Sequence, residues 1–424
     1  MARRYFGTDG VRGIVGEDLT PQLVERLGFA ATAWAGGGAV FIGRDTRASG
    51  RDLEHAFASG VASAGGNAIL AGVLPTPAVA LLALDLGVVI SASHNPPEYN
   101  GVKFFHGTGR KLTDAEEEEI ETLLDDRQLN PEQGRIDNLE VAVDSYLDHV
   151  LTRFRSDLTG LRIGVDCANG SYSWIAPRAF ETLGAEVSAI GVSPNGSNIN
   201  VDCGATDLRA LQQLVREQQL DLGVAFDGDG DRVLAVDGNG DALDGDQILA
   251  ILALDLGVDL VIVTSMTNLG FHRLMADRGV RVVTTDVGDR YVLEALQREG
   301  GVLGGEQSGH IIYLDGHVTG DGLAGALVLC AALHGRPLAE ISSVMERYPQ
   351  VKENVNVRVA RRELSDHLRD EVARLNEELQ GRGRVLVRPS GTEPVVRVLA
   401  EAENGEEAAD LCASITALVT SELG

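Results

Sequence analysis

The chain has 424 residues and carries 36 Lys and Arg against 63 Asp and Glu, a formal net charge of −27. Its apolar fraction of 44% is that of a globular protein and excludes a disordered chain. The excess of negative charge, with no basic stripe, excludes non-specific binding to nucleic acid or to anionic lipid. An anionic substrate would have to be held by local cations. At roughly 100–200 residues per domain, the length predicts two to four domains.

No segment indicates export or membrane insertion. Residues 1–10 lack the apolar core of a signal peptide. The uncharged stretch 56–84 is long enough to span a bilayer, but its Gly, Asn and Pro residues predict a helix, a strand and a second helix in a soluble core. The four cysteines are Cys167, Cys203, Cys330 and Cys412. None has CxxC spacing, so we expect small buried apolar side chains in a cytoplasmic protein.

The first unit, residues 1–140, alternates short apolar runs with amphipathic helices, which predicts an α/β fold. Strands are expected at Ala39–Ile42, Ala68–Ala71 and Val88–Ile90, and helices at Asp52–Ala64, Ala78–Leu84 and Asp114–Leu124. Thr113 and Glu116 predict a capping box for the last helix, whose acidic run is interpreted as a solvated face. The polar stretch 128–138 predicts a linker.

Three further units follow, at 141–240, 241–346 and 347–424. The second is expected to have strands at Leu161–Val165, Glu186–Ile190 and Leu222–Phe226 and helices at Ile175–Leu183 and Leu208–Gln218. The third is expected to have helices at Gln247–Leu256, Phe271–Asp277 and Arg290–Arg298 and strands at Leu260–Thr264, Arg281–Thr284 and Val302–Leu303. The fourth reads as α+β, with strands at Val355–Val359, Val385–Val387 and Val395–Ala400 and helices at Leu364–Leu379 and Glu407–Leu418.

The first loop whose residues could take part in a reaction is Ser91-Ala92-Ser93-His94-Asn95-Pro96, directly after a predicted strand. Ligands of open α/β sheets bind beyond the carboxyl ends of strands, so Ser93 is a candidate nucleophile. A Ser/Thr turn before an X-Pro bond is the alternative. Lys103 follows in a chain with only three lysines, and a buried lysine can transfer protons where arginine cannot. Lys111 and Lys352 are given no such role.

The second loop is Asp227-Gly228-Asp229-Gly230-Asp231-Arg232. Three carboxylates at alternate positions can converge on one hard cation, and a few protein oxygens suit Mg²⁺. A hairpin turn is the alternative, because apolar runs flank the loop. The spacing excludes an EF-hand, whose sixth residue is Gly and whose twelfth is Glu. Arg232 would place a cation beside a phosphate.

Two more loops contain polar groups suited to a phosphorylated sugar. In Gly304–His310, Glu306 and Ser308 could bind sugar hydroxyls and His310 could assist proton transfer. In Arg388–Pro394, two hydroxyls and a glycine N–H lie near Arg397, which suits a phosphate cradle. Ordinary turns are the alternative in both. Together the four loops indicate metal-dependent phosphoryl transfer, by a phosphotransferase or a phosphatase.

The same loops, in the same order, resemble the α-D-phosphohexomutase superfamily. The resemblance runs from Phe6-Gly7-Thr8-Asp9-Gly10-Val11-Arg12-Gly13 through ISASHNP, FDGDGDR, Val287–Val292 and GEQSGH to RPSGTEP. It implies three similar α/β domains and a C-terminal α+β phosphate-binding domain around a central cleft. Two departures are a somewhat short chain and Thr267-Asn268 where Ser-Asn is expected.

The resemblance also implies roles for individual residues. Ser93 would carry the phosphoryl group, and with Asp227, Asp229 and Asp231 would bind one Mg²⁺. Arg12, Lys103, His310 and Arg232 would assist transfer. The substrate would be bound by Glu306, Ser308, Asp289, Arg290, Arg388, Ser390, Gly391, Thr392 and Arg397.

The implied reaction interconverts glucosamine 6-phosphate and glucosamine 1-phosphate through a sugar bisphosphate, for cell-wall precursor synthesis. The partner is thus a small phosphosugar, and a homodimer is one expected assembly. A mutase acting on mannose or glucose phosphates shares every catalytic element. A phosphatase would not need phosphate recognition at both ends of the sugar, and a non-catalytic sensor would show no turnover.

Overall fold

The computed structural model describes residues 4–7, 9–125, 132–358, 363–389 and 394–424. By its internal packing the chain divides into two compact bodies, called unit 1 and unit 2 from here on, which differ from the four segments predicted from the sequence. Unit 1 comprises Met1–Met266 and Val280–Val344, and unit 2 comprises Thr267–Gly279 and Met345–Gly424. Within the described residues, unit 1 holds three mixed sheets and unit 2 one antiparallel sheet, which confirms the predicted α/β class.

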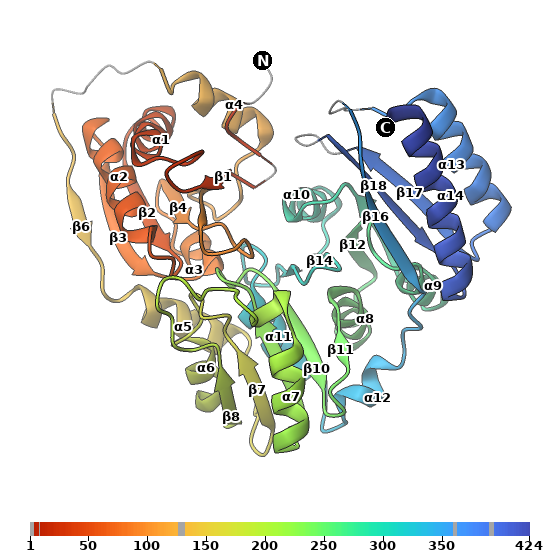
Figure 1. Ribbon diagram of the computed structural model, residues 1–424. Helices are drawn as coiled ribbons and strands as arrows, with labels where there is room; N and C mark the ends of the chain where they lie inside the picture. Colours follow the sequence, from red (N-terminus) through yellow and green to blue (C-terminus); the bar gives the residue numbers. More distant parts are fainter. Residues whose placement is uncertain (1–3, 8, 126–131, 359–362, 390–393) are drawn as a thin grey trace. The chain divides into compact units, whose positions relative to one another are not determined.

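The first sheet has the strand order β1-β5-β4-β2-β3-β6 (Figure 1). Its strands are β1 Val11–Ile14, β2 Ala39–Arg44, β3 Asn67–Val73, β4 Leu86–Ile90, β5 Tyr99–His106 and β6 Ile136–Asn138. Its helices are α1 Pro21–Trp34, α2 Gly50–Ser63, α3 Thr76–Leu81 and α4 Asp114–Thr122. Strands β2, β3, β4 and β6 are parallel, and β5 runs antiparallel between β4 and β1.

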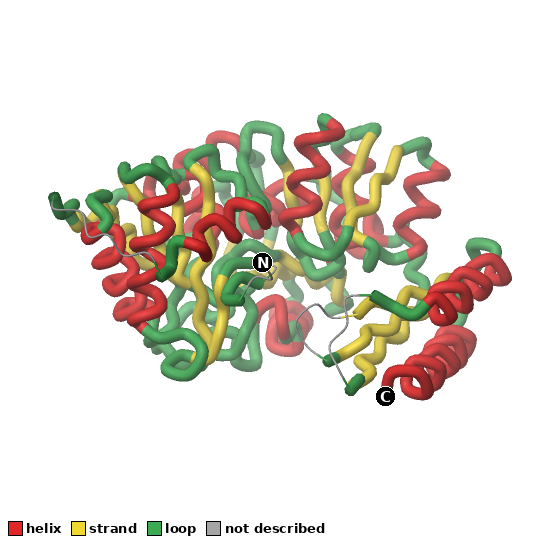
Figure 2. The backbone as a smooth tube through the Cα atoms, turned by 90° about the horizontal axis from the view of Figure 1, so that it is seen from above, coloured by secondary structure: helices red, strands yellow, loops and turns green. Residues whose placement is uncertain are grey.

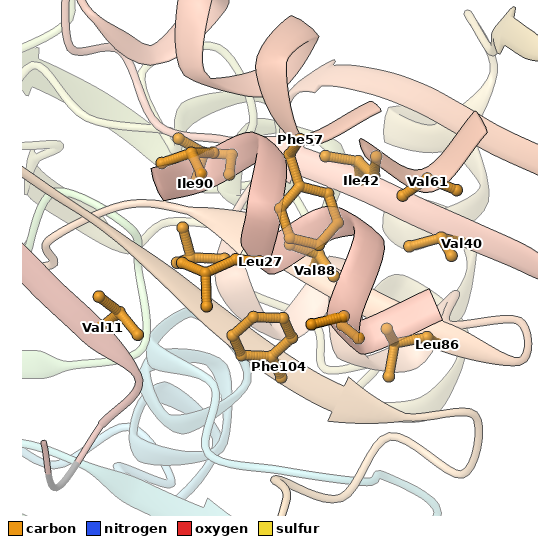
Figure 3. Close-up of a cluster of buried hydrophobic side chains, with 14 of the residues drawn as sticks. Val11, Leu27, Val40, Ile42, Phe57, Val61, Leu86, Val88, Ile90 and Phe104 are labelled. Atoms are coloured by element: carbon orange, nitrogen blue, oxygen red, sulfur yellow. The ribbon is translucent and has the colours of Figure 1, made fainter. Parts of the chain in front are cut away.

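Alternate residues of the central strands enter one apolar core, as the period of two in a strand requires. Figure 3 shows this core, in which Val40 and Val88 lie opposite Leu27 of α1 and Phe57 of α2. All four side chains are fully buried. Because the core fixes β4, the loop that follows its carboxyl end starts from a rigid position.

The second sheet has the order β11-β10-β9-β7-β8 and the third β13-β12-β14-β15. The second contains α5 Ala142–Arg153, β7 Arg162–Asp166, α6 Ala176–Thr182, β8 Glu186–Ile190, the 3₁₀ turn Gly204–Thr206, α7 Arg209–Gln218, β9 Leu222–Phe226, β10 Val233–Asp237 and β11 Ala242–Leu243. The third contains α8 Gly245–Asp255, β12 Leu260–Thr264, β13 Arg281–Thr285, α10 Asp289–Glu299, β14 Leu303–Gly305, β15 Ile311–Tyr313, α11 Gly322–Ala331 and α12 Leu338–Ser342.

One structural feature recurs in these three sheets. In each, a parallel strand is followed by a loop and then by an antiparallel strand, in the pairs β4–β5, β9–β10 and β14–β15. The three loops carry Ser93, the Asp227–Arg232 segment and Glu306. The Asp227–Arg232 segment therefore does join a hairpin, and this turn also presents three carboxylates, so the two sequence interpretations are compatible.

Unit 2 contains the fourth sheet, with the order β16-β18-β17. Its elements are α9 Leu269–Asp277, β16 Gln350–Asn356, α13 Asp366–Leu379, β17 Arg384–Pro389, β18 Val395–Glu401 and α14 Gly405–Leu423. Helices α13 and α14 cover one face of the sheet (Figure 2). Helix α9 joins this unit because Asn268 accepts from the backbone N–H of Tyr348 at 3.0 Å and donates to its carbonyl at 2.9 Å.

Several local expectations can be compared with the structure. The capping box of Thr113 and Glu116 is present, and all four cysteines are free and buried. The predicted linker is wrong at its end, because residues 136–138 form β6 beside β3. No helix among the described residues is long and apolar enough to cross a membrane.

The α1–α2 contact gives a prediction for stability. A Cβ atom at Gly60 of α2 would collide with the carbonyl oxygen of Glu25 in α1. Gly→Ala normally stabilises a helix by about 1 kcal/mol, but here we expect Gly60→Ala to destabilise the first domain by about 1–3 kcal/mol through overpacking. Denaturant unfolding measures this, with Gly405→Ala as the control because no neighbouring atom lies near a Cβ there. A stabilised Gly60→Ala variant would contradict the prediction.

Candidate active site

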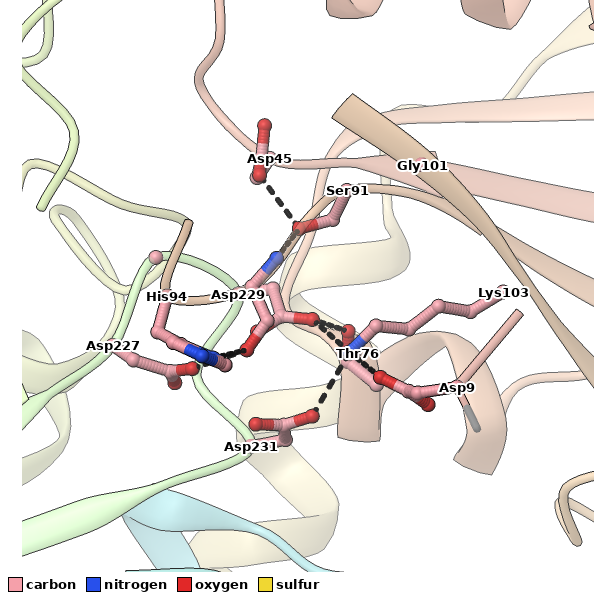
Figure 4. A network of polar contacts seen from close by, with 12 residues as sticks. Asp9, Asp45, Thr76, Ser91, His94, Gly101, Lys103, Asp227, Asp229 and Asp231 are labelled. Atoms are coloured by element: carbon pink, nitrogen blue, oxygen red, sulfur yellow. Dashed lines mark hydrogen bonds and ion pairs between the residues drawn. The ribbon is translucent and has the colours of Figure 1, made fainter. Parts of the chain in front are cut away.

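Ser93 occupies a constrained turn after β4. Its side chain is buried, and its φ of 53° lies in the left-handed region, which is unfavourable for a residue other than Gly. The Ser93 backbone N–H donates to Ser91 Oγ at 2.9 Å, and Ser91 Oγ donates to Asp45 at 2.6 Å (Figure 4). These bonds help to hold the turn in a conformation that aims the Ser93 hydroxyl at the second loop.

Arg47 holds the same turn by hydrogen bonds to its backbone carbonyls. Its guanidinium is fully buried and pairs with Asp45 at 2.9 Å. It also donates to the carbonyl oxygens of Ser93 at 3.0 Å and Asn95 at 2.7 Å, and to those of Pro96 and Tyr99. A planar group with five donors is suited to gathering several carbonyls. Arg47 therefore fixes the backbone on both sides of the candidate nucleophile.

The three aspartates of the second loop converge, as their spacing predicted. Each is buried, and one carboxylate oxygen from each lies within 4.8 Å of the others. Ser93 Oγ donates to Asp227 Oδ2 at 2.6 Å, so the nucleophile candidate and the carboxylate cluster form one site. Thr76 contacts Asp229 twice, through its hydroxyl at 2.6 Å and through its N–H to the Asp229 carbonyl at 2.8 Å.

Lys103 lies at the centre of this cluster. Figure 4 shows its ammonium among Asp9, Asp229 and Asp231, at 3.0, 2.7 and 3.0 Å. Burial would lower the pKa of Lys103, but Asp229 and the other carboxylates raise it well above its usual value. Lys103 is therefore a buried cation that balances carboxylate charge.

Lys111 extends this network of charges, and the sequence, which gave it no proton-transfer role, did not indicate its ion pairs. Its buried ammonium contacts Asp9 at 2.6 Å and Asp289 at 2.7 Å. Arg12 pairs with Asp9 from the other side and donates to Asn95 Oδ1 at 3.2 Å. Burial would raise the pKa of Asp9, yet the surrounding Lys103, Lys111 and Arg12 hold it well below its usual value.

The third loop meets the second through backbone and side-chain contacts. The Val233 N–H donates to the Gly309 carbonyl at 2.9 Å. His310 Nδ1 lies 2.8 Å from Glu306, and His310 Nε2 lies 3.1 Å from Asp231 and 3.3 Å from Arg232 Nε. Burial would lower the pKa of His310, but Asp231 is the leading cause that raises it to about 10.

The predicted sugar-binding residues Ser308, Glu306 and Arg290 differ in exposure and partners. Ser308 is exposed, and Glu306 accepts from the Gly288 N–H at 3.0 Å. Arg290 is buried and pairs with Glu117 at 2.5 Å and with Asp114 at 2.6 Å. Glu117 lies in the acidic run of α4, which was interpreted as a solvated face. That interpretation is wrong for Glu117, because folding places the buried Arg290 against it.

The remaining predicted residues belong to unit 2. Arg388 and Arg397 are direct cross-strand partners on β17 and β18, so their side chains leave the same face of the sheet. The pair therefore places two guanidinium groups side by side, and such groups are suited to binding a phosphate or a carboxylate. Ser390, Gly391 and Thr392 lie outside the described residues.

The carboxylate cluster suits a divalent cation. Asp229 Oδ1 is buried and has no hydrogen-bond partner among the residues that the structure describes. Burial, followed by repulsion from Asp231 and Asp229, raises the pKa of Asp227 to about 7. A hard cation would relieve both conditions, since buried carboxylate oxygens are the ligands that Mg²⁺ prefers.

Several site residues escaped sequence reasoning. They are Asp9, Asp45, Arg47, Thr76, His94 and Lys111. His94 Nδ1 lies 3.4 Å from Ser93 Oγ, and burial is the main cause that lowers its pKa to about 3. His94 lies in the SASHNP motif and Asp9 in the FGTDG motif near the N-terminus, so their place in these motifs was the only sequence feature that indicated them. Arg47 and Thr76 had none.

Comparison with known proteins covers nearly the whole chain. Models of the phosphoglucomutase/phosphomannomutase family match residues 3–130 (α/β/α domain I), 144–240 (domain II), 244–348 (domain III) and 355–418 (C-terminal domain). A phosphoglucosamine mutase of Pelotomaculum thermopropionicum is 48% identical over 94% of this chain and 95% of its own length. That of Bacillus subtilis is 44% identical over 99% of each.

Solved structures agree in fold. A phosphoglucomutase/phosphomannomutase family protein from Burkholderia thailandensis superposes with a TM-score of 0.82 at 23% identity, over 98% of this chain and 97% of that one. An N-acetylphosphoglucosamine mutase of Aspergillus fumigatus, solved with GlcNAc-6P and magnesium, gives 0.72 at 19% identity, over 99% and 96%. With four family domains in order and such close full-length relatives, the chain belongs to the phosphoglucosamine mutases of the phosphohexomutase superfamily and is an isomerase.

Proposed function

We propose that the chain interconverts glucosamine 6-phosphate and glucosamine 1-phosphate, using Ser93 as the phosphoryl carrier. The observation that carries this proposal is the contact between the Ser93 hydroxyl and Asp227 beside two further buried carboxylates. A hydroxyl held against a carboxylate cluster of this kind is suited to carrying a phosphoryl group. The choice of an amino sugar is supported by the full-length similarity to phosphoglucosamine mutases.

In the proposed reaction, phosphorylated Ser93 donates its phosphoryl group to the free hydroxyl of the substrate. The bond between phosphorus and Ser93 Oγ breaks and a bond to the sugar oxygen forms. The sugar hydroxyl gives its proton to a general base, and Ser93 Oγ takes up a proton and becomes a hydroxyl again. The resulting sugar bisphosphate turns over and returns its other phosphoryl group to Ser93. We assign sugar binding to Glu306, Ser308, Asp289 and Arg290.

Magnesium is the proposed cofactor, held by Asp227, Asp229, Asp231 and the phosphoserine. When bound, it would neutralise charge on the transferring phosphoryl group. Lys103, Arg12 and Arg232 contribute fixed cations around the same point, and their contacts with the aspartates keep them there. His310 lies between Glu306 and Asp231, which suits a proton-handling role near the sugar.

The non-reacting phosphate is assigned to unit 2. The cross-strand pair of Arg388 and Arg397 supports this assignment, because it places two guanidinium groups on one face of the sheet, and guanidinium groups are suited to binding phosphate. Ser390, Gly391 and Thr392 complete the proposed cradle by sequence. Recognition of this second phosphate distinguishes a mutase from a phosphatase. We also propose a cytoplasmic enzyme and a homodimer, which localisation and sedimentation experiments would test.

Substrate conversion tests the function directly. Purified protein with Mg²⁺ and a trace of sugar bisphosphate is incubated with glucosamine, glucose or mannose 6-phosphate and followed by ³¹P NMR. We expect a 1-phosphate resonance to grow fastest with glucosamine 6-phosphate. Faster conversion of glucose or mannose would reassign the sugar, and inorganic phosphate in every tube would indicate a phosphatase.

The nucleophile is tested by Ser93→Ala. We expect this variant to lose interconversion and to lack phosphate at residue 93 by mass spectrometry, because no other oxygen replaces Ser93 Oγ beside Asp227. Ser145→Ala, at an exposed position on α5, is the control and should retain full activity. A Ser93→Ala variant that keeps most of the wild-type rate would refute the phosphoserine.

The metal is tested by removal and by substitution. EDTA should abolish turnover, and Mg²⁺ in excess should restore it. Asp227→Asn removes one anionic ligand and should lower both activity and cation affinity, whereas Asp241→Asn, at an exposed turn, should change neither. Turnover that is unaffected by EDTA would contradict a metal-dependent mechanism.

A further inference from the structure

A second buried polar cluster lies in unit 1, formed by residues that the proposed reaction does not use. Both carboxylate oxygens of Asp321 accept tyrosine hydroxyls, Oδ1 from Tyr172 and Oδ2 from Tyr146, each at 2.8 Å. The two hydroxyl oxygens lie 2.7 Å apart. All three side chains are at most 1% exposed, so no solvent competes for these contacts.

Asp321 is a charged group in this cluster. Burial would raise its pKa, but His317, the Ala324 N–H and the Tyr172 hydroxyl together lower it. Burial, followed by the charge of Asp321, raises the pKa of both tyrosines well above the usual value, so they remain neutral donors. His317 Nε2 lies 3.1 Å from Asp321 on its other side. A buried carboxylate is costly unless it is well bonded, so this cluster requires a structural or functional explanation.

Residues of this cluster pack against the loop that carries the three aspartates. The ring of Tyr172 packs edge-on against Phe226, with centroids 4.9 Å apart, directly before Asp227. The same ring lies so close to Gly230 that a Cβ there would collide with it, and Gly230 has a φ of 76°. Beside it, the Ser171 N–H donates to the Gly228 carbonyl at 2.9 Å.

Asp321 reaches the same loop by a second route. Its carboxylate caps α11 by accepting from the Ala324 N–H at 3.0 Å. The neighbouring Gly322 N–H, at the start of that helix, donates to the Gly230 carbonyl at 3.0 Å. The carboxylate therefore orients both the tyrosine ring and the helix end that contact Gly230, the residue between Asp229 and Asp231.

We propose that Tyr172 and Asp321 are positioning residues that hold the Asp227–Arg232 loop in its cation-binding conformation. The inference rests on the proposed metal site. Both act on the loop at Gly230, Tyr172 through its ring and Asp321 through the start of α11, and not through the carboxylates of the site. A phenylalanine at position 172 would fill the same space, which makes the hydroxyl the part of the side chain that orients rather than packs.

Cation affinity in the absence of sugar is the direct test. Free Mn²⁺ is measured by electron paramagnetic resonance during titration of the wild type, Tyr172→Phe and Asp321→Asn. Loss of supporting contacts around metal ligands commonly lowers affinity by about 10-fold or more, and we expect a decrease of roughly three- to tenfold for these more distant positions. Tyr313→Phe is the matched control, because the Tyr313 hydroxyl donates to Asp315 and not to Asp321, and this variant should bind as the wild type.

A kinetic measurement separates positioning from general destabilisation. For Tyr172→Phe we expect the Mg²⁺ concentration at half-maximal activity to rise, with kcat at saturating Mg²⁺ near that of the wild type. A purely structural defect would lower the active fraction and leave that Mg²⁺ concentration unchanged.

Wild-type Mn²⁺ affinity in both Tyr172→Phe and Asp321→Asn would overturn the proposal and leave the metal site intact. If the wild type itself bound no Mn²⁺, or if Asp227→Asn bound it equally well, the metal site and this inference would both fail. The two failures are therefore distinguishable within one set of titrations.

Discussion

The charge balance around Lys103 is the constraint on which the site depends. Asp9, Asp229 and Asp231 surround one buried ammonium. Asp9 comes from the segment before β1, the other two aspartates come from the loop between β9 and β10, and Lys103 itself lies on β5. Buried carboxylates repel one another unless cations lie between them. Lys103, Lys111 and Arg12 supply that compensation without saturating it, because Asp229 Oδ1 has no hydrogen-bond partner in the described part of the chain and the pKa of Asp227 is raised. The same arrangement therefore holds the loops together and leaves capacity for a divalent cation.

A repeated structural feature brings these charges together. In each of three sheets, a parallel strand is followed by a loop and then by an antiparallel strand. Each of these loops carries part of the site. Because the loops leave buried strands, their side chains start from rigid positions. Backbone hydrogen bonds, such as that from the Val233 N–H to the Gly309 carbonyl, then fix the position of one loop relative to the next. A mutase needs this rigidity at the phosphoryl group, while the sugar has to change orientation.

Residues that touch no substrate account for much of the geometry. Arg47 gathers the carbonyls around Ser93, and Thr76 holds Asp229 by side chain and backbone. The Tyr172–Asp321 cluster contacts the same aspartate loop at Gly230. Burial of such polar groups is unfavourable unless every partner is present, which explains why they occur in connected networks rather than singly.

The sequence by itself determined the α/β class, the four chemical loops and the family. Those features depend on local patterns: apolar runs that end in glycine-rich polar segments, three aspartates at alternate positions, and motifs in a fixed order. The tertiary structure decided which distant charges meet. Lys111 and Asp289 are 178 residues apart, and Arg290 and Glu117 are 173 apart. Nothing in the local sequence distinguishes Glu117 from its solvated neighbours in α4. Only the packing of α10 against the first domain buries it, and burial turns an ordinary surface charge into an obligatory partner.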